Sequence, residues 1–293
     1  MMFLKIAKSS MSQSKSKISS KRILVSGGAG SIGSELVRQL APKNKVYVLD
    51  QDETGVVDLS EELKLKGYWV EGRVGNFKDM ETVRDVFSDF KPQYVFHAGA
   101  LKHVSPAEKF PLEYIKTNIL GTYNLLHTAK NWNTTEKFIF VSTDKVINAR
   151  SIMGATKRVG EIMARNFGYI AVRFGNVLGS RGSAIPFWQN QINRGDPVTV
   201  TDHRMERYFM TVEQACELVI EAATVGKPGE TLVLNMGKPV NVLNLAKKIL
   251  SESGSNVGLK MIGIRPGETL GEELMTEEEK KTAFTRGKFY VIP

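Results

Sequence analysis

A glycine-rich segment near the start of the chain constrains its fold more than any other feature. The segment SGGAGSIG (26–33) follows an apolar β-rich run and precedes a helical pattern. Gly27 permits a tight turn, Gly30 lets a ligand approach the backbone, and Gly33 lets the helix pack closely on a sheet. The free N–H groups at the start of such a helix can bind a pyrophosphate. This order of strand, turn and helix predicts a dinucleotide-binding unit.

Short β-rich runs and helical patterns alternate along the first two thirds of the chain. The predicted strands are 23–25, 46–49, 68–70, 94–97, 138–141 and 170–174, and the helical patterns include 34–40, 78–90 and 121–130. Such alternation favours an α/β fold with a doubly wound parallel sheet of the Rossmann type. Ligands of these sheets bind outside the carboxyl ends of the strands.

The pattern divides the chain into three regions. We predict a disordered basic tail at 1–20, a dinucleotide-binding domain at 21–175, and a smaller, mainly substrate-binding lobe at 176–293 with segments that return to the main domain. Of the net charge of +9, six basic side chains and no acid lie within residues 1–22. No aromatic residues interleave with these charges, as stacking on bases would require, so we expect no nucleic-acid partner.

Composition indicates the compartment. No apolar run is long enough to cross a bilayer, and the chain does not begin with a signal-peptide pattern. Cys216 is the single cysteine, which excludes an intrachain disulfide and a multi-cysteine zinc site. The histidines lack metal-ligand spacing, so no metal is expected. These features favour a cytoplasmic protein.

Asp50 ends the second β-rich run, roughly 20 residues after the glycine segment. A carboxylate in this position accepts hydrogen bonds from the ribose hydroxyls of a dinucleotide and repels a 2′-phosphate. No arginine follows it directly. The expected cofactor is therefore NAD rather than NADP.

Seven further motifs occur in order. They are HAGALKHV (97–104), TNILGT (117–122), VSTDK (141–145), MGATKR (153–158), RFGNVLGSRGS (173–183), RYFMT (207–211) and RPGE (265–268). With the Gly-x-x-Gly-x-x-Gly spacing, the series resembles the polysaccharide-biosynthesis family of nucleotide-sugar 4,6-dehydratases, which are extended short-chain dehydrogenases. The resemblance covers about residues 21–293. It implies NAD-dependent dehydration of a nucleotide-activated N-acetylhexosamine, with UDP-N-acetylglucosamine favoured, to its 4-keto-6-deoxy form.

A 4,6-dehydration needs an acid, a base and an oxygen-holding group close together. Oxidation at C4 acidifies the C5 proton, a base removes that proton, and an acid protonates the departing 6-hydroxyl. Thr143, Asp144 and Lys145 supply these three types directly after an apolar run. In isolation the Asp–Lys pair would be read as a surface pair. The resemblance implies that Thr143 binds O4, Asp144 is the acid at O6 and Lys145 is the base at C5.

Most short-chain dehydrogenases pair a tyrosine with a lysine four residues later on one helix face. Here Lys157 has Met153 in the tyrosine position. A thioether cannot act as a base, which argues against an ordinary dehydrogenase. The chain resembles a Met-Gly-x-x-Lys subgroup of the dehydratases, in which Lys157 would hold the nicotinamide ribose. Met153 can also serve plain core packing.

The remaining site residues follow from side-chain chemistry and the resemblance. Cofactor contacts are expected from Gly27, Gly30, Ser31, Ile32, Gly33, Asp50, Ala98, Ala100, Lys102 and Lys157, and substrate contacts from Lys102, Asn176, Ser180, Arg181, Arg207, Arg265 and Glu268. Arginine suits a diphosphate because it binds bidentately. Some of these residues could equally be structural.

The chain departs from the family pattern at three positions. Arg73 stands where relatives usually carry an aspartate facing the adenine, Gly99 replaces an alanine, and Thr269 replaces a lysine. These departures leave adenine and outer nucleotide contacts open. Membrane-anchored relatives have a transmembrane region upstream, and this chain resembles the soluble branch.

Two rival functions remain. A nucleotide-sugar 4-epimerase shares this fold, and an inactive NAD-binding scaffold would show a residue such as Met153. The Thr143-Asp144-Lys145 run argues against both, because neither needs an acid and a base at C6 and C5. By analogy with related enzymes we also expect a homo-oligomer, at least a dimer, formed through the apolar faces of 78–90 and 121–130.

Overall fold

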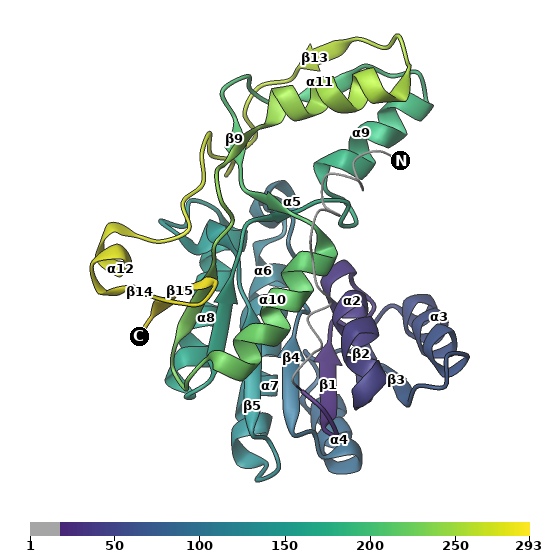
Figure 1. Cartoon of the computed structure of the whole chain (residues 1–293), viewed down its shortest axis with the longest axis vertical. Helices are drawn as coiled ribbons and strands as arrows, with labels where there is room; N and C mark the ends of the chain where they lie inside the picture. The colour runs from purple at the N-terminus through teal and green to yellow at the C-terminus, as the bar shows by residue number, and fades with distance from the viewer. Residues whose placement is uncertain (1–17) are drawn as a thin grey trace.

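The computed structural model describes residues 18–293, and every statement below concerns this part of the chain. Its main body is a nine-stranded sheet with the order β14-β15-β11-β6-β5-β4-β1-β2-β3 (Figure 1). The strands are β1 (Arg22–Ser26), β2 (Lys45–Asp50), β3 (Val70–Val74), β4 (Tyr94–His97), β5 (Lys137–Val141), β6 (Ile170–Arg173), β11 (Thr231–Leu234), β14 (Phe284–Arg286) and β15 (Phe289–Ile292). All pair in parallel except β14 and β15. The predicted doubly wound α/β fold is confirmed.

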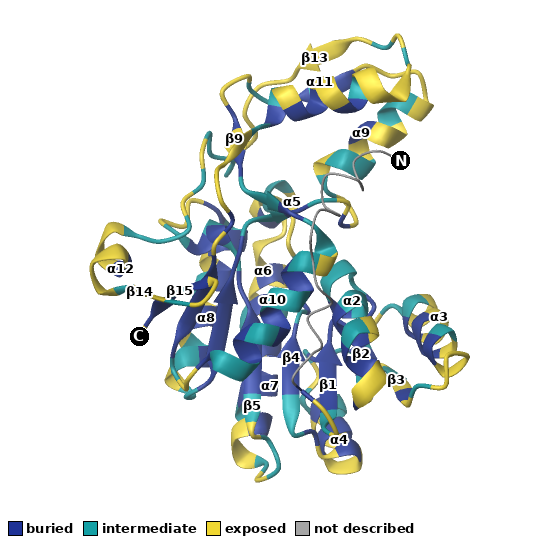
Figure 2. Ribbon diagram, viewed as in Figure 1, coloured by how far each residue is buried: buried dark blue, intermediate teal, exposed yellow. Residues whose placement is uncertain are grey.

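Helices cover both faces of the sheet. The helical segments are α2 (Ser31–Leu40), η1 (Ala41–Lys43), α3 (Glu53–Lys64), α4 (Met80–Phe90), α5 (Val104–Lys109), α6 (Pro111–Tyr114), the π-helix η2 (Ile115–Gly121), α7 (Thr122–Asn131), η3 (Asp144–Val146), α8 (Ile152–Asn166), α9 (Ala184–Asn193), α10 (Val212–Val225), α11 (Val242–Ser253) and α12 (Glu277–Thr282). Alternate residues of β1 point to opposite faces: Ile23 and Val25 join the core under α2, α3 and α10, and Leu24 joins the core under α4, α7 and α8. Figure 2 shows the central strands buried between these layers.

The strand order reverses between β1 and β4. On one side of β1 the sheet continues with β2 and β3, and on its other side it continues with β4, β5 and β6. In doubly wound sheets the loops part at such a point and leave room for a ligand. The glycine segment leaves β1 at this reversal. The topology therefore puts the predicted phosphate-binding turn at the ligand-binding edge of the sheet.

The chain after residue 175 contributes to two bodies. A small lobe holds α9 and α11 with the short strands β8 (Val198–Val200), β9 (Glu206–Arg207), β12 (Val240–Asn241) and β13 (Leu259–Met261), and β7 (Asn176–Val177) pairs with β10 (Phe209–Met210) at its base. The lobe has its own core around Trp188, Leu245 and Ile249. Other segments return to the main sheet: α10 packs beside α2, β11 joins β6, and the C-terminal hairpin closes that edge.

Two predicted boundaries were wrong. The third strand runs over Val70–Val74 instead of 68–70, because it is the exposed edge strand and lacks the apolar run that marks the inner strands. Residues 18–20 of the predicted disordered tail are ordered: Ile18 is buried, and the Ser20 N–H donates to the Lys43 carbonyl at 2.8 Å. The rest of that tail, 1–17, lies outside the described residues.

No helix between residues 18 and 293 combines the length and apolar character needed to span a bilayer.

Candidate active site

A cleft of about 1220 Å³ opens where the carboxyl ends of the parallel strands meet the small lobe. Its lining contains most of the predicted site residues: Gly30, Ser31, Ile32, Gly33, Ala98, Ala100, Lys102, Thr143, Asp144, Lys145, Met153, Lys157, Asn176, Ser180, Arg181, Arg207, Arg265 and Glu268. Gly27 and Asp50 lie outside this lining, in the turn after β1 and at the end of β2. The fold thus brings together side chains from positions far apart in the sequence.

The glycine turn leaves no space for side chains at two of its glycines. Gly27 has φ +71°, and a Cβ there would lie 2.3 Å from the Gly99 Cα. A Cβ on Gly33 would lie 2.1 Å from the Gly27 carbonyl oxygen, so α2 could not pack on the turn. Gly99, a departure from the family pattern, has a physical reason as well, because a Cβ there would lie 2.5 Å from the Phe77 ring.

The start of α2 is built to receive an anion. Gly30 is its N-cap and provides no side-chain acceptor, whereas Asp52 caps α3 and Ser151 caps α8. The first N–H groups of α2 therefore face the cleft with no side-chain cap, where a helix terminus favours negative charge. Asp50 accepts hydrogen bonds from the Ala29 N–H at 3.0 Å and the Asp52 N–H at 3.1 Å, which holds its carboxylate beside this turn. The residues present fit a dinucleotide.

Arg181 lines the cleft and contacts the glycine turn. The sequence analysis assigned it to the substrate, but its backbone N–H donates to the Ser31 hydroxyl at 2.9 Å. Its guanidinium contacts the Ala29 carbonyl and forms an ion pair with Asp52 at 3.1 Å. The segment after β7 therefore crosses over the glycine turn, and Arg181 lies on that side of the cleft.

Lys102 adds a second cation to the same side of the cleft. The cleft walls, and then the charge of Arg181, lower the pKa of its ammonium. Two cations and an uncapped helix start converge here, which is the chemistry that a diphosphate needs.

The Thr143-Asp144-Lys145 run forms the floor of the cleft directly after β5. The Thr143 hydroxyl donates to Asp144 Oδ1 at 3.0 Å, and Lys145 Nζ lies 3.0 Å from the same oxygen. Lys145 Nζ also donates to Asn176 Oδ1 at 3.2 Å. Asp144 is buried, and its Oδ2 has no hydrogen-bond partner among residues 18–293. The predicted acid and base are thus adjacent, with one carboxylate oxygen left free.

The environment shifts the pKa of both groups. Burial, supported by the charge of a nearby carboxylate, Glu272, raises the pKa of Asp144 well above its usual range despite the opposing charge of Lys145. Burial alone would lower the pKa of Lys145, but Asp144 and Glu272 together raise it. The arrangement therefore favours a protonated Asp144 and a charged Lys145 before substrate binds.

Lys157 and Met153 lie one helical turn apart on α8. Lys157 Nζ donates to the Val141 carbonyl at 2.5 Å and lies 4.0 Å from the centroid of the Phe140 ring. Burial lowers its pKa to about 7. Met153 is buried beside Tyr114 while its side chain also borders the cleft, so it fills core space and offers no proton at the cleft wall.

Arg207 makes several contacts with the protein itself. Its guanidinium donates to the carbonyls of Glu206 at 2.7 Å, Thr269 at 2.7 Å and Leu270 at 3.1 Å, and its Nε lies 3.2 Å from Glu272 Oε1. These contacts give Arg207 a structural role, and because it also lines the cleft its contact with the substrate stays a prediction. Motif spacing could not reveal the contacts with Thr269 and Leu270, because these residues lie 62 and 63 positions away.

Of the other predicted substrate residues, Arg265 faces the cleft, whereas Glu268 and Ser180 form hydrogen bonds within the protein. Arg265 is exposed at the cleft, and its guanidinium makes no ion pair within the described chain. Glu268 accepts from the Arg265 N–H at 3.0 Å and so shapes that turn. Ser180 is buried and donates to the Val177 carbonyl at 3.0 Å. Of the three predicted substrate arginines, Arg265 is thus the one whose guanidinium makes no ion pair among residues 18–293, whereas Ser180 supports the loop.

Glu272 is a site residue that the sequence analysis missed. Its side chain is 7% exposed, and its Oε2 lies 3.0 Å from Lys145 Nζ. It comes from the C-terminal segment, 127 positions after Lys145. The only indication in the sequence is an acidic pair after a glycine, which has no motif spacing.

Two further groups of side chains in the described residues, those around Arg73 and the possible metal ligands, add nothing to the cleft. Arg73 pairs with Asp85 at 2.8 Å outside the cleft lining, so this departure faces another helix. Within residues 18–293, no three His, Cys, Asp or Glu side chains gather as metal ligands would.

Relatives of this chain include capsule and exopolysaccharide proteins. The capsular polysaccharide biosynthesis protein CapD of Staphylococcus aureus is 42% identical over 90% of this chain and 46% of its own length. The probable polysaccharide biosynthesis protein EpsC of Bacillus subtilis is 40% identical over 92% of this chain and 47% of its own. The chain spans about half the length of these relatives. A UDP-glucose 4-epimerase of Rickettsia typhi is 32% identical over 93% of this chain and 83% of its own.

Solved structures share the architecture. Pen from Bacillus thuringiensis superposes with a TM-score of 0.87 at 35% identity, over 94% of this chain and 88% of Pen. The UDP-glucose 4-epimerase of Thermotoga maritima, solved with UDP-glucose, has a TM-score of 0.77 at 26% identity, over 89% and 91%. DesIV from Streptomyces venezuelae, a dTDP-glucose 4,6-dehydratase solved with NAD, has a TM-score of 0.78 at 20% identity over 89% and 90%, which shows the fold alone.

The motifs, the cleft and these likenesses agree in one assignment. The sequence profile of one family, described as "Polysaccharide biosynthesis protein", matches residues 23–293, which include both lobes and every residue of the cleft. The chain belongs to this polysaccharide biosynthesis protein family, within the extended short-chain dehydrogenases, and the solved structures that it resembles include a nucleotide-sugar epimerase.

Proposed function

We propose that this protein dehydrates a nucleotide-activated N-acetylhexosamine, with UDP-N-acetylglucosamine as the favoured substrate, to the 4-keto-6-deoxy sugar. The observation that carries the proposal is the buried Asp144–Lys145 pair at the end of β5, 3.0 Å apart and open to the cleft. An acid and a base this close serve an elimination, in which a proton leaves one carbon as a hydroxyl leaves its neighbour. The cofactor in the proposal is NAD, which fits the uncapped start of α2 and the carboxylate of Asp50.

Bound NAD supplies the redox chemistry, as hydride acceptor at C4 and hydride donor at C6. The residues of the chain would manage the protons. Thr143 would donate to O4, and Asp144 would protonate the leaving 6-hydroxyl. Lys145 would take the C5 proton after its ammonium has first lost a proton to solvent. The raised pKa of Asp144 supports its role as the acid, because it keeps the carboxyl protonated nearer to neutral pH. The buried Lys157 would hold the nicotinamide ribose.

A 4-epimerase is the second candidate, and one observation favours it. The Rickettsia relative named UDP-glucose 4-epimerase matches nearly the whole chain at 32% identity. An epimerase needs no acid at the 6-hydroxyl, and Met153 cannot provide the proton transfer of the usual tyrosine. These two points support the dehydratase.

Incubation with UDP-N-acetylglucosamine, GDP-N-acetylglucosamine and UDP-glucose, followed by NMR of the products, tests the proposal. A new methyl signal at C6 with loss of the C4 proton is the expected result. A product that keeps its 6-hydroxyl with C4 inverted would establish the epimerase. Tightly bound NAD with no turnover of any substrate would indicate the inactive scaffold.

The proposal includes a cytoplasmic homo-oligomer, at least a dimer. Cys216 is buried and free, which suits a reducing compartment. The predicted interface needs correction, because Val86 and Phe87 of α4 and Leu125 and Leu126 of α7 are fully buried in the core of their own chain.

Exposed apolar side chains lie instead along the neighbouring η2, α7 and α8. They are Ile115, Leu120, Tyr123, Val159 and Ile162. A second copy of the chain would cover this surface. Light scattering at micromolar concentration is expected to give at least twice the monomer mass, and a monomer would refute the oligomer.

A further inference from the structure

Glu272 joins the two lobes through its carboxylate. Its Oε2 accepts from Lys145 Nζ at 3.0 Å, and its Oε1 pairs with Arg207 Nε at 3.2 Å. The side chain is 7% exposed, so both contacts are largely shielded from water. Lys145 thus lies between two carboxylates, Glu272 and Asp144, at equal distances of 3.0 Å.

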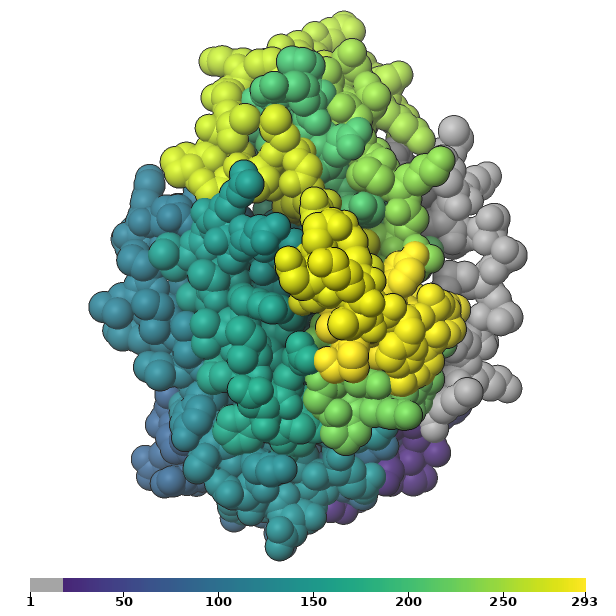
Figure 3. Space-filling model, turned by 90° about the vertical axis from the view of Figure 1, so that its left-hand side faces the viewer, coloured from purple at the N-terminus to yellow at the C-terminus, as the bar shows by residue number. Residues whose placement is uncertain are grey.

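The backbone on both sides of Glu272 is anchored by buried arginines. Upstream, Arg207 holds the carbonyls of Thr269 and Leu270. Downstream, Arg173 donates to the Leu274 carbonyl at 2.9 Å. In Figure 3 the C-terminal segment, in yellow, runs from the small lobe down across the main domain, along the path that these contacts secure.

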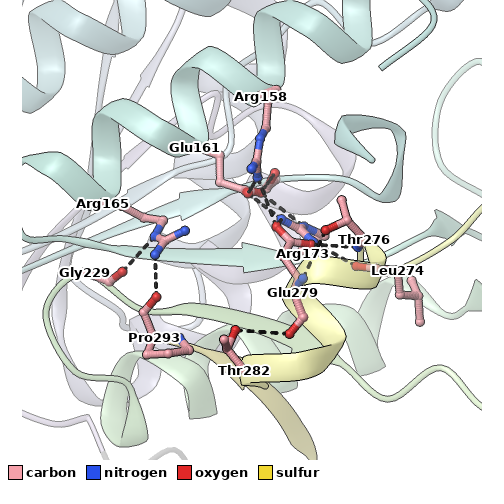
Figure 4. Close-up of polar contacts among 11 residues, drawn as sticks. Arg158, Glu161, Arg165, Arg173, Gly229, Leu274, Thr276, Glu279, Thr282 and Pro293 are labelled. Atoms are coloured by element: carbon pink, nitrogen blue, oxygen red, sulfur yellow. Dashed lines mark hydrogen bonds and ion pairs between the residues drawn. The ribbon is translucent and has the colours of Figure 1, made fainter. Parts of the chain in front are cut away.

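The downstream anchor is a buried ion network (Figure 4). Arg173 is fully buried at the end of β6 and pairs with Glu161 of α8 and with Glu279 of α12, the latter at 2.7 Å. Glu279 also forms a capping box with Thr276 at the start of α12. A desolvated pair with two helices attached resists displacement, because separating its charges would leave one of them buried alone. The backbone on both sides of Glu272 is therefore fixed, and this fixes the position of the Glu272 carboxylate next to Lys145.

We propose that Glu272 is a positioning residue of the active site, which holds the Lys145 ammonium beside Asp144 and places a fixed negative charge that favours a proton on Asp144. The proposal deepens the proposed dehydration and rests on it for its catalytic meaning. Glu272 itself would touch no reacting atom.

The charges around the pair support this role. The charged groups that face Asp144 and Lys145 are Glu272 on the C-terminal segment and, behind it, Arg207 on β9. With all groups ionised, two carboxylates meet one ammonium inside the cleft, and Arg207 offsets only the far oxygen of Glu272. Protonation of Asp144 relieves this excess of negative charge. Removal of the Glu272 charge should lower the pKa of both Asp144 and Lys145.

The test is infrared titration of the NAD-loaded protein, which detects the absorption of a protonated carboxyl group. Asp144→Asn identifies the band of Asp144. In Glu272→Gln the midpoint of that band is expected to fall by about one pH unit or more. Glu277→Gln removes the same charge from the exposed face of α12 and should leave the midpoint unchanged.

Glu272→Asp serves as the second variant if Glu272→Gln does not fold, as judged by circular dichroism. It withdraws the carboxylate from Lys145 without removing the charge, so the midpoint should fall by a smaller amount. An unchanged midpoint in the variants that fold would overturn the proposal. Because this measurement needs no substrate, it decides the role of Glu272 even if the dehydration proposal fails.

Where the protein does dehydrate a sugar nucleotide, the pH profile adds a second readout. Both limbs of the kcat/KM profile should move to lower pH in Glu272→Gln, because both pKa values fall. A purely structural role would lower the rate without moving the limbs, and that result would contradict the proposal.

Discussion

Arg181 forms an ion pair with Asp52 at 3.1 Å across 129 positions of the chain, and so ties the segment before the small lobe to the cofactor turn. The contact with the Ala29 carbonyl and the backbone hydrogen bond to Ser31 also hold this segment over the start of α2. We call these three contacts of Arg181 the clasp. If the proposed dehydration is correct, the nicotinamide is reused in every turnover, and such a clasp would keep the cofactor in place.

Arg181→Ala is expected to release NAD about tenfold faster, through loss of an exposed ion pair and a charged hydrogen bond. The measurement is the NAD content of purified protein during dialysis, by fluorescence of the nucleotide after reduction. Arg204→Ala, which removes an exposed arginine of the small lobe, should retain NAD like the native chain. Equal retention of NAD in both variants would show that the clasp does not hold the cofactor. Recovery of mainly NADP from the native protein would contradict the prediction that Asp50 selects NAD.

Asp144→Asn is expected to bind substrate and NAD but to stall elimination, with a rate loss of roughly 100- to 10,000-fold. Reduced nicotinamide should then accumulate and be visible by its absorbance. Lys145→Ala should stop exchange of the C5 proton with deuterated water. Because the two residues act in one step, the double variant should be little slower than either single one. Near-native dehydration by Asp144→Asn would return the pair to a structural role.

Met153→Tyr is expected to leave dehydration within about tenfold of the native rate, since the proposed proton transfers run through Thr143, Asp144 and Lys145. Any loss of rate or stability in Met153→Tyr should come from fitting the larger tyrosine ring into the packed space beside Tyr114. Steady-state kinetics of Met153→Tyr and Met153→Ala provide the check. If Met153→Ala were as damaging as Asp144→Asn, the site would be misassigned.

Lys157 links the cofactor site to pH-dependent stability. Its folded pKa of about 7 lies below its ordinary value of 10.5, so between these values the unfolded chain binds more protons and stability rises with pH. Below about pH 7 both states are protonated and the full cost of the buried ammonium remains. Lys157→Met should therefore raise the free energy of unfolding at pH 6 by about 2 kcal/mol, which a higher Tm would reveal. This gain should shrink toward pH 10. A gain that grows with pH would contradict this sign.

The buried network around Arg173 should dominate the stability of the C-terminal segment. Glu161→Ala removes one of its two carboxylate partners and is expected to cost about 3–5 kcal/mol in urea unfolding. Glu278→Ala, on the exposed side of α12, should cost less than about 0.5 kcal/mol. Similar losses in the two variants would show that the network contributes little.

The amino-acid sequence alone determined the features that depend on neighbouring positions. The glycine turn, the alternation of strands and helices, the Thr143-Asp144-Lys145 run and the Met153–Lys157 spacing are all local, and the parallel sheet then puts their strand ends on one edge. For this reason the fold class was predictable, and so was the central part of the cleft.

Only the tertiary structure decided which side chains meet across the two lobes. Glu272 lies 127 positions after Lys145 in the chain and contacts it, Arg207 donates to backbone carbonyls of the C-terminal segment, and Arg181 contacts the glycine turn. The partner of a long charged side chain depends on which segments the packed core brings within about 4 Å, and no spacing in the sequence encodes that distance. The edge strand β3 was misplaced for a related reason, because its exposed side chains need no apolar run.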